Sequence, residues 1–173
     1  FPRPGGHLHP GRIRAGLLAP LLRRYPEARF VLMHIAYPYS PELLALVKHF
    51  PNCYADLCWA WAIDPYTGVD FVGRFIHAAP ITKLFAFGSD TVSPTSAYAY
   101  ALQMRRWLTR ALEAEVADGL LTEREAIWVA TRVLRENQLQ CFDVAGTQAA
   151  VRKIAGDPAA LAQWPYRYRP PHT

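Results

Sequence analysis

Cysteine is scarce in this chain of 173 residues, and long apolar runs are lacking. The three cysteines, Cys53, Cys58 and Cys141, form no CxxC pair and are odd in number, which argues against a disulfide framework or a structural zinc knot. No stretch approaches the roughly 20 uninterrupted apolar residues of a membrane-spanning helix, and the first residues do not have the pattern of a signal peptide. We therefore expect reduced thiols, a cytoplasmic location and no membrane contact.

Charge of a single sign is also lacking. The 19 Lys and Arg residues are spread along the chain among 14 Asp and Glu, which leaves a net charge of +5. The densest basic cluster, Arg167 and Arg169, lies in a proline-rich tail, where a solvated chain end is the simpler interpretation. The sequence thus predicts no nucleic-acid partner, and we expect a small-molecule substrate instead.

The composition, 51% hydrophobic and 19% charged, is typical of a globular protein. One domain is the default at this length, whereas a complete (β/α)8 barrel typically needs about 250 residues. Any barrel in this chain must therefore lack some of its units. The chain also begins at Phe1 instead of Met, so we expect that an upstream segment was removed or lies outside this sequence.

Helical and strand patterns alternate along the first half of the chain. An amphipathic helix is expected over residues 12–24, and the apolar run RFVLMH at 29–34 is typical of a strand buried on both faces. This pair of patterns recurs twice, as a helix over 41–50 with Ser40 as N-cap before a strand at 53–59, and as a helix over 70–79 before a strand at 83–87. The order predicts a parallel α/β sheet with right-handed crossovers.

Only helices are predicted after the third strand. They cover residues 95–116, a segment opened by a Thr122/Glu125 capping box and running to about 136, and a short stretch within 147–155. We expect one domain over residues 1–173, made of a loop (1–10), βα units (11–94), a helical segment (95–156) and a tail (157–173).

Polar residues stand where the predicted strands end. His34 ends the first strand, and Asp90 follows Gly88 and Ser89 after the third. Carboxyl ends of parallel strands meet at one edge of a sheet, so an imidazole and a carboxylate there make a plausible metal or acid/base pair. The alternatives are a hydrogen-bonded structural histidine and an aspartate that forms a turn or a helix N-cap. Asp56, in the middle of the second strand, is either buried with a partner or aimed into the barrel, and a structural role is favoured.

These segments also carry a resemblance to a known family. FVLMH with AYPY, then PNCYADLCW, then KLFAFGSD, and finally NQLQCFDV occur in the order and at the intervals of the last barrel strands of the amidohydrolase superfamily. The chain resembles the amidohydrolase-related branch of that superfamily over residues 10–142. The resemblance implies a partial TIM barrel, consisting of the last three to four β/α units of a (β/α)8 fold and a C-terminal helical segment.

The resemblance also implies roles for particular residues. His34 would bind a divalent metal, expected to be zinc, or the reacting group, and Asp90 would bind the metal and accept the proton of the attacking water. Members of the family mostly hydrolyse C–N or C–O bonds, and some decarboxylate their substrates. The loops over such a site supply possible substrate-binding residues: Tyr37, Tyr39, Trp59, Trp61 and Ser89.

Two strands that carry metal ligands in the family have no counterpart in this sequence. His7 and His9 imitate the family's His-x-His pair, but no apolar strand precedes them, so we expect loop residues near the substrate. With only His34 and Asp90 as ligands, the chain alone should bind metal weakly or not at all. The alternative function is a truncated, catalytically incomplete protein that self-associates or pairs with a missing upstream barrel half through the edge strand at 29–34.

Overall fold

The structure, a computed structural model, describes residues 14–156. The loop expected over residues 1–10, including His7 and His9, and the tail expected over 157–173 lie outside the described residues. By contacts the chain separates into two compact units, one ending at Asn137 and one beginning at Gln138, and the single domain over residues 1–173 stays a prediction. Between residues 14 and 156, no helix is long and apolar enough to cross a membrane.

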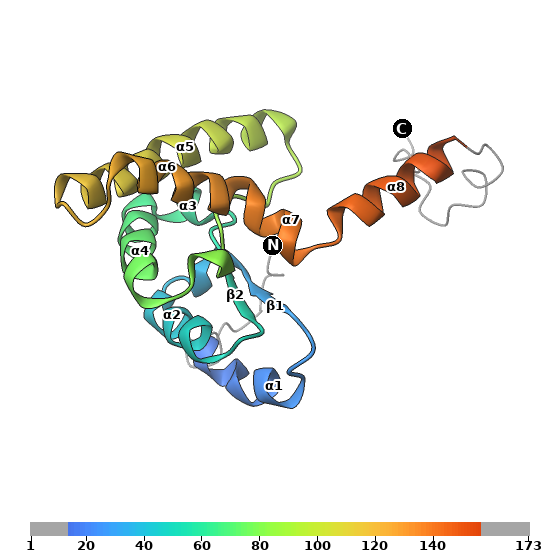
Figure 1. Cartoon of the computed structure of the whole chain (residues 1–173), viewed down its shortest axis with the longest axis horizontal. Coiled ribbons are helices and arrows are strands. Elements are labelled where there is room, and N and C mark those ends of the chain that lie inside the picture. The colour runs from blue at the N-terminus through green and yellow to red at the C-terminus, as the bar shows by residue number, and fades with distance from the viewer. Residues whose placement is uncertain (1–13, 157–173) are drawn as a thin grey trace, which may run out of the picture. The chain divides into compact units, whose positions relative to one another are not determined.

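The first unit alternates helices and strands and then continues as helices only (Figure 1). Short 3-10 turns are labelled η, and η5 is a π-helical turn. In chain order the elements are η2 (Ala15–Leu18), α1 (Ala19–Arg24), β1 (Phe30–Leu32), η3 (Met33–Ala36), α2 (Ser40–His49), β2 (Cys53–Asp56), α3 (Ala60–Ile63), α4 (Pro65–Ala78), η4 (Ile81–Lys83), β3 (Leu84–Phe85), α5 (Pro94–Ala117), α6 (Glu123–Thr131) and η5 (Arg132–Glu136).

The three strands form one parallel sheet in the order β1-β2-β3. Phe30 is opposite Cys53, and Ala55 is opposite Leu84. The predicted parallel α/β class is therefore confirmed, although each strand is shorter than expected because the chain turns away from the ladder soon after it pairs. All three carboxyl ends consequently lie at one edge of the sheet.

The core lies between the sheet and the helices that follow its strands. Helix α2 packs against β2 and α4, and α4 packs against α5. Val47 from α2, Phe75 from α4 and Leu84 from β3 are fully buried. The residues of β1 are only half-buried, and β2 alternates between buried and half-buried positions. Burial on both faces, expected for the first strand, is thus not seen among the described residues, and Asp56 points to the more open face.

Helix α4 begins at Pro65, five residues before the predicted start at residue 70. Asp64 is its N-cap, because its Oδ1 accepts hydrogen bonds from the backbone N–H groups of Tyr66 and Thr67, both at 3.1 Å. Its Oδ2 also accepts a hydrogen bond from the Thr67 hydroxyl at 2.7 Å. An Asp followed by Pro at the first helical position is a start signal that the hydrophobic pattern alone does not show.

The cap at Asp64 makes stability depend on pH. Hydrogen bonds from Thr67 hold the pKa of Asp64 below its usual value of 3.8. Asp64 therefore contributes its full stabilisation of the folded state above pH 3.8. That stabilisation is lost as the pH falls through the lower pKa that Asp64 has in the folded protein. Asp64→Asn retains a good capping side chain but cannot titrate. We expect urea denaturation between pH 5 and pH 3 to show a shallower loss of stability in Asp64→Asn than in the wild type, and equal slopes would contradict this role.

The helices after β3 agree with the sequence in position. The capping box predicted at Thr122 and Glu125 is confirmed: the Thr122 hydroxyl accepts the Glu125 N–H at 3.3 Å, and the Glu125 carboxylate accepts the Thr122 N–H at 2.8 Å. The N-cap predicted at Ser40 is wrong. Tyr39 occupies that position, and Ser40 is the buried first residue of α2.

The second unit contains most of α7 (Asn137–Cys141) and all of α8 (Val144–Ala155). Asp143 caps α8 by accepting the Gly146 N–H at 2.9 Å. Helix α8 begins three residues before the segment expected within 147–155, and none of its residues is buried.

Candidate metal and acid/base site

The candidate site lies where the three parallel strands end. His34 is two residues beyond β1, Cys58 and Trp59 follow β2, and Asp90 follows β3. The His34 Nε2 atom is 3.4 Å from the Asp90 Oδ2 atom. The structure therefore brings together the imidazole and the carboxylate that the sequence predicts as a pair, on the same edge of one sheet.

His34 sits in an unusual backbone turn. His34, Ile35 and Ala36 have φ values of 58°, 48° and 52°, which is the left-handed region that L residues other than Gly seldom enter. Ile35 is β-branched and fully buried, so its side chain anchors this strained conformation in the core. The peptide bond between Tyr37 and Pro38 is cis. This turn directs the His34 ring across the end of β2.

The hydrogen bond at Nδ1 indicates which nitrogen of the His34 ring carries a hydrogen when the ring is neutral. The His34 Nδ1 atom is 2.8 Å from the carbonyl oxygen of Cys58. A carbonyl can only accept, so Nδ1 carries the hydrogen and donates it. In the neutral ring, Nε2 then presents its lone pair toward the Asp90 carboxylate. Two acceptors facing each other at this distance are stabilised by a shared proton or a bound cation between them.

Asp90 lies in a second strained loop. Its φ is 45°, again in the left-handed region, which Asp tolerates better than most residues. The loop is attached to the end of β2, because the Trp59 N–H donates to the Gly88 carbonyl at 2.7 Å. The side chains of His34 and Asp90 are 34% and 48% exposed. Both groups are thus held by the backbone and remain open to a ligand.

A cleft of about 510 Å³ opens beside Asp90. Trp59 contributes one wall, and its ring meets the His34 ring edge-on with the centroids 5.8 Å apart. The loop after β3 and the second turn of α5 form the rest. The lining residues are Trp59, Ser89, Asp90, Thr91, Val92 and Tyr100.

The predicted substrate-binding residues divide into three groups. Trp59 and Ser89 line the cleft, whereas Tyr37 and Tyr39, in the loop after His34, are not among its lining residues. Trp61 is in the core: it is 2% exposed, and its Nε1–H donates to the Ala86 carbonyl at 2.9 Å. The prediction that Trp61 contacts substrate is therefore corrected, because α3 turns this ring inward.

Tyr100 is a cleft residue that the sequence did not predict. Its helical spacing with Met104 and Trp107 is typical of a core-facing stripe, and Met104 is buried, but Tyr100 lines the cleft. Its position was the available signal: Tyr100 is in the second turn of α5, and the start of a helix that follows a parallel strand lies close to that strand's carboxyl end.

Burial raises the pKa values of two groups at the end of β2. It raises the pKa of the Asp56 carboxyl, while the Cys58 N–H and the nearby His34 act in the opposite direction. Burial also raises the pKa of the Cys58 thiol to about 11, helped by the negative charges of Asp56 and Asp90. At neutral pH this favours the protonated thiol of Cys58 over the thiolate, which is the nucleophilic form.

The donor set fits a divalent cation in type but is incomplete in number. An imidazole nitrogen and a carboxylate oxygen are common zinc ligands, and zinc sites usually have three or four protein ligands. Over residues 14–156, no group of three or more His, Cys, Asp or Glu side chains is arranged to hold a metal. His34 and Asp90 can thus supply two ligands.

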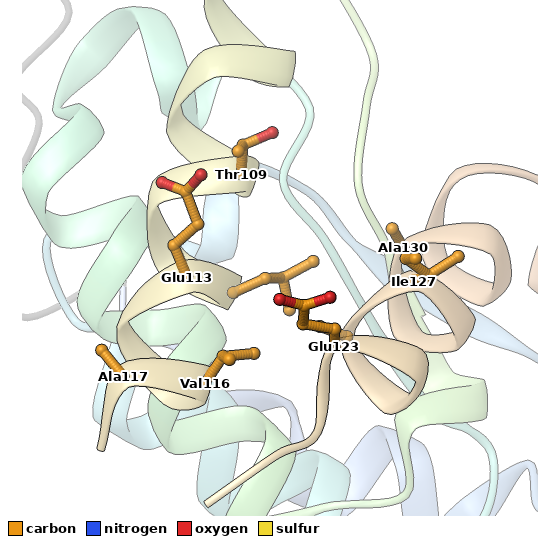
Figure 2. A pocket seen from close by; sticks show the side chains of 9 residues that line it. Thr109, Glu113, Val116, Ala117, Glu123, Ile127 and Ala130 are labelled. Carbon is orange, nitrogen blue, oxygen red and sulfur yellow. The ribbon is translucent and has the colours of Figure 1, made fainter. Parts of the chain in front are cut away.

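A second cavity lies away from the sheet edge. It has a volume of about 480 Å³ and lies between α5, which contributes Glu113 and Val116 to its lining, and α6, which contributes Glu123 and Ile127 (Figure 2). It contains no imidazole and none of the residues at the carboxyl ends of the strands. This cavity therefore shares no residue with the rim that carries His34 and Asp90.

Comparison with known proteins agrees with this architecture. The fold and the rim define a protein with a parallel α/β sheet and a polar site at the carboxyl ends of its strands. Residues 9–161 match the family model described as Amidohydrolase. The chain belongs to the amidohydrolase family.

Individual relatives cover this chain well but are much longer. Protein fluG of Emericella nidulans is 27% identical over 128 residues, which are 73% of this chain and 15% of that protein. A crystal structure of a "putative metal-dependent hydrolase" from Lactobacillus casei shares the fold with a TM-score of 0.53 at 23% identity, over 68% of this chain and 31% of that one. The chain thus spans less than a third of the length of either relative.

Proposed function

We propose that this chain forms the carboxyl-terminal part of the active site of a metal-dependent hydrolase, with β1, β2 and β3 as the last three strands of a (β/α)8 barrel. The observation that carries the proposal is the convergence of His34 and Asp90, with Nε2 and Oδ2 3.4 Å apart. Membership of the amidohydrolase family and the fold shared with a protein described as metal-dependent support it. A cytoplasmic location is part of the same proposal, because Cys53 and Cys58 are free thiols.

His34 and Asp90 have distinct roles in this proposal. The His34 Nε2 lone pair and an Asp90 oxygen would hold the ion, which we propose to be zinc because both donors suit it. A divalent ion held there supplies Lewis-acid activation of water and of the substrate. Asp90 keeps a second carboxylate oxygen, which can accept the proton of the attacking water. Asp90 therefore acts as the general base next to the position where the ion binds.

The cleft beside Asp90 would hold the substrate. Trp59 and Tyr100 offer aromatic surface with a polar edge, and Ser89 offers a hydroxyl near the carboxylate. Such walls orient a small molecule and exclude water from the rest of the site. The reaction is a C–N or C–O hydrolysis or a decarboxylation, and the loops that select among substrates lie outside the described residues.

Metal content of the full natural protein tests the proposal. We expect the protein to contain zinc, to lose hydrolytic activity when treated with a chelator, and to regain it when zinc is added. His34→Asn should lose most of the bound metal, because it removes one of the ligands. His77→Asn is the matched control, since His77 also pairs with a carboxylate, Glu115, at 2.6 Å but lies on α4 away from the rim.

Elemental analysis measures the zinc content of both variants and of the wild type, and circular dichroism checks that each variant is folded. Full metal occupancy in His34→Asn, or full activity in the metal-free wild type, would contradict the proposed function. Equal losses in both histidine variants would show that the metal is not bound at this rim.

A second candidate function rests on the edge of the sheet. The order β1-β2-β3 places β1 at an edge, and an edge strand can accept a further strand from another chain. In this reading the protein is a non-enzymatic partner that self-associates or completes a barrel with another chain. Sedimentation velocity on the metal-free protein distinguishes the two, because this function requires a dimer or a complex at micromolar concentration whereas the hydrolase function does not.

A further inference from the structure

The turn after β2 contacts both halves of the candidate site. Leu57, Cys58 and Trp59 lie between His34, which follows β1, and Asp90, which follows β3. The Leu57 N–H donates to the Phe85 carbonyl at 2.9 Å, and the Trp59 N–H donates to the Gly88 carbonyl at 2.7 Å. The conformation of this turn therefore determines where the rim residues of both neighbouring strands lie.

Cys58 is the residue through which the turn reaches His34. Its carbonyl oxygen accepts the His34 Nδ1–H at 2.8 Å. Its side chain is buried and packs so closely on Gly88 that a Cβ built on Gly88 would lie 2.5 Å from the sulfur. Cys58 thus cannot move toward β3, and the direction of its carbonyl depends on the peptide groups on either side.

Asp56 holds the peptide on the amino side of Cys58. Its Oδ1 accepts the Cys58 N–H at 2.7 Å, across two residues. This is the local hydrogen bond by which Asp fixes a turn. The following residue, Trp59, adopts the left-handed conformation with a φ of 56°, so the chain reverses where Asp56 holds it. The Asp56 carboxylate, the Cys58 peptide and the His34 imidazole form one connected series of hydrogen bonds.

We propose that Asp56 is a positioning residue that sets the tautomer of His34 by fixing the Cys58 carbonyl as the acceptor for Nδ1–H. This inference rests on the proposed function, because His34 can bind a metal ion, or share a proton with Asp90, only if its Nε2 atom has a free lone pair. Asp56 is not among the residues that line the cleft, and its Oδ1 accepts a hydrogen bond from the backbone of Cys58. Its effect passes through the backbone, as the partners that orient metal-binding histidines commonly act.

The state of the His34 ring can be measured directly in the metal-free protein. Long-range nitrogen–proton correlation spectra of the imidazole distinguish a protonated ring nitrogen from an unprotonated one. In the neutral wild-type ring we expect a single form, with Nδ1 protonated and Nε2 free, so that the two nitrogen signals are widely separated. Without the fixed carbonyl both tautomers are populated, and the two signals converge.

Two substitutions separate geometry from charge. Asp56→Asn removes the charge but retains an oxygen that can accept the Cys58 N–H, so we expect the separated signals of the wild type. Asp56→Glu retains the charge but places the carboxylate one methylene too far for the two-residue turn, so we expect converged signals. Asp56→Ala should behave like Asp56→Glu, and if it does not fold, the other two variants still decide the question.

Two results would overturn the proposal. One is a wild-type pattern in Asp56→Glu, which would show that the tautomer does not depend on this hydrogen bond. The other is convergence in Asp56→Asn, which would show that the tautomer depends on the charge of Asp56 and that an oxygen able to accept the Cys58 N–H is not enough. The spectra require neither metal nor activity, so the tautomer can be as expected even if the proposed function fails.

In the full protein, Asp56→Glu should weaken zinc binding by about 10- to 100-fold, whereas Asp56→Asn should not.

Discussion

Replacing Asp90 with asparagine should lower the turnover of the full natural protein by about 10³-fold while leaving the fold intact, since general acid–base groups typically contribute 10²–10⁴-fold. Asparagine has the same shape and can still occupy the left-handed conformation with a φ of 45°. It lacks the negative charge that faces His34 Nε2 and the oxygen that would accept a proton from water. The loss should therefore appear in kcat, because the substitution removes the proton acceptor and leaves the other residues that line the cleft unchanged.

The matched control for this prediction is Asp70→Asn. Asp70 is also an exposed carboxylate, but it lies on α4 and pairs with Arg74 at 2.7 Å. Exposed pairs one helical turn apart contribute only a few tenths of a kcal/mol to stability, so the control should retain wild-type kcat and stability. Steady-state kinetics with zinc present, together with thermal unfolding, gives both readouts. Wild-type kcat in Asp90→Asn would remove this residue from the mechanism.

The positions of His34 and Asp90 could be predicted because they depend on a simple rule. Short apolar runs separated by helices predict parallel strands, and parallel strands end on one side. The sequence alone therefore predicts that the histidine after the first run and the aspartate after the third lie on the same rim. The distance between them was not predictable, since it depends on the left-handed turn at Ile35 and the loop at Gly88, which have no strong sequence signal.

The aromatic residues show where sequence reasoning fails. Trp59 and Trp61 stand in the same predicted loop, yet Trp59 is 40% exposed and lines the cleft while Trp61 is 2% exposed. The difference arises because Trp59 adopts a left-handed conformation as the N-cap of the short helix α3, and this helix directs the ring of Trp61 inward. Hydrophobicity cannot separate two tryptophans, and a two-residue change in helical phase decides which one is buried.

The environment of Trp61 predicts a large effect on stability. The ring is packed against Gly68, where an added Cβ would lie 2.8 Å from ring carbons. Its N–H also satisfies the Ala86 carbonyl, just beyond β3. Trp61→Ala leaves a cavity at the junction of α3, α4 and β3, and we expect it to lower the free energy of unfolding by about 3–5 kcal/mol. Trp61→Phe fills most of this space but leaves the carbonyl unpaired, so a smaller loss of about 1–3 kcal/mol is expected.

Trp59→Ala is the comparison that tests whether Trp61 acts in the core and Trp59 in the cleft. A ring that lines an open cleft contributes little to folding, so this variant should remain within about 1 kcal/mol of the wild type in urea denaturation while raising KM in the full protein. If Trp61→Ala were as stable as Trp59→Ala, the Trp61 ring would not support the rim. The Trp61 ring also matters for the chemistry. Its N–H donates to the Ala86 carbonyl, and Ala86 leads directly into the loop that holds Asp90. Loss of the Trp61 anchor should therefore also lower the activity of the molecules that still fold, although Trp61 touches no part of the cleft.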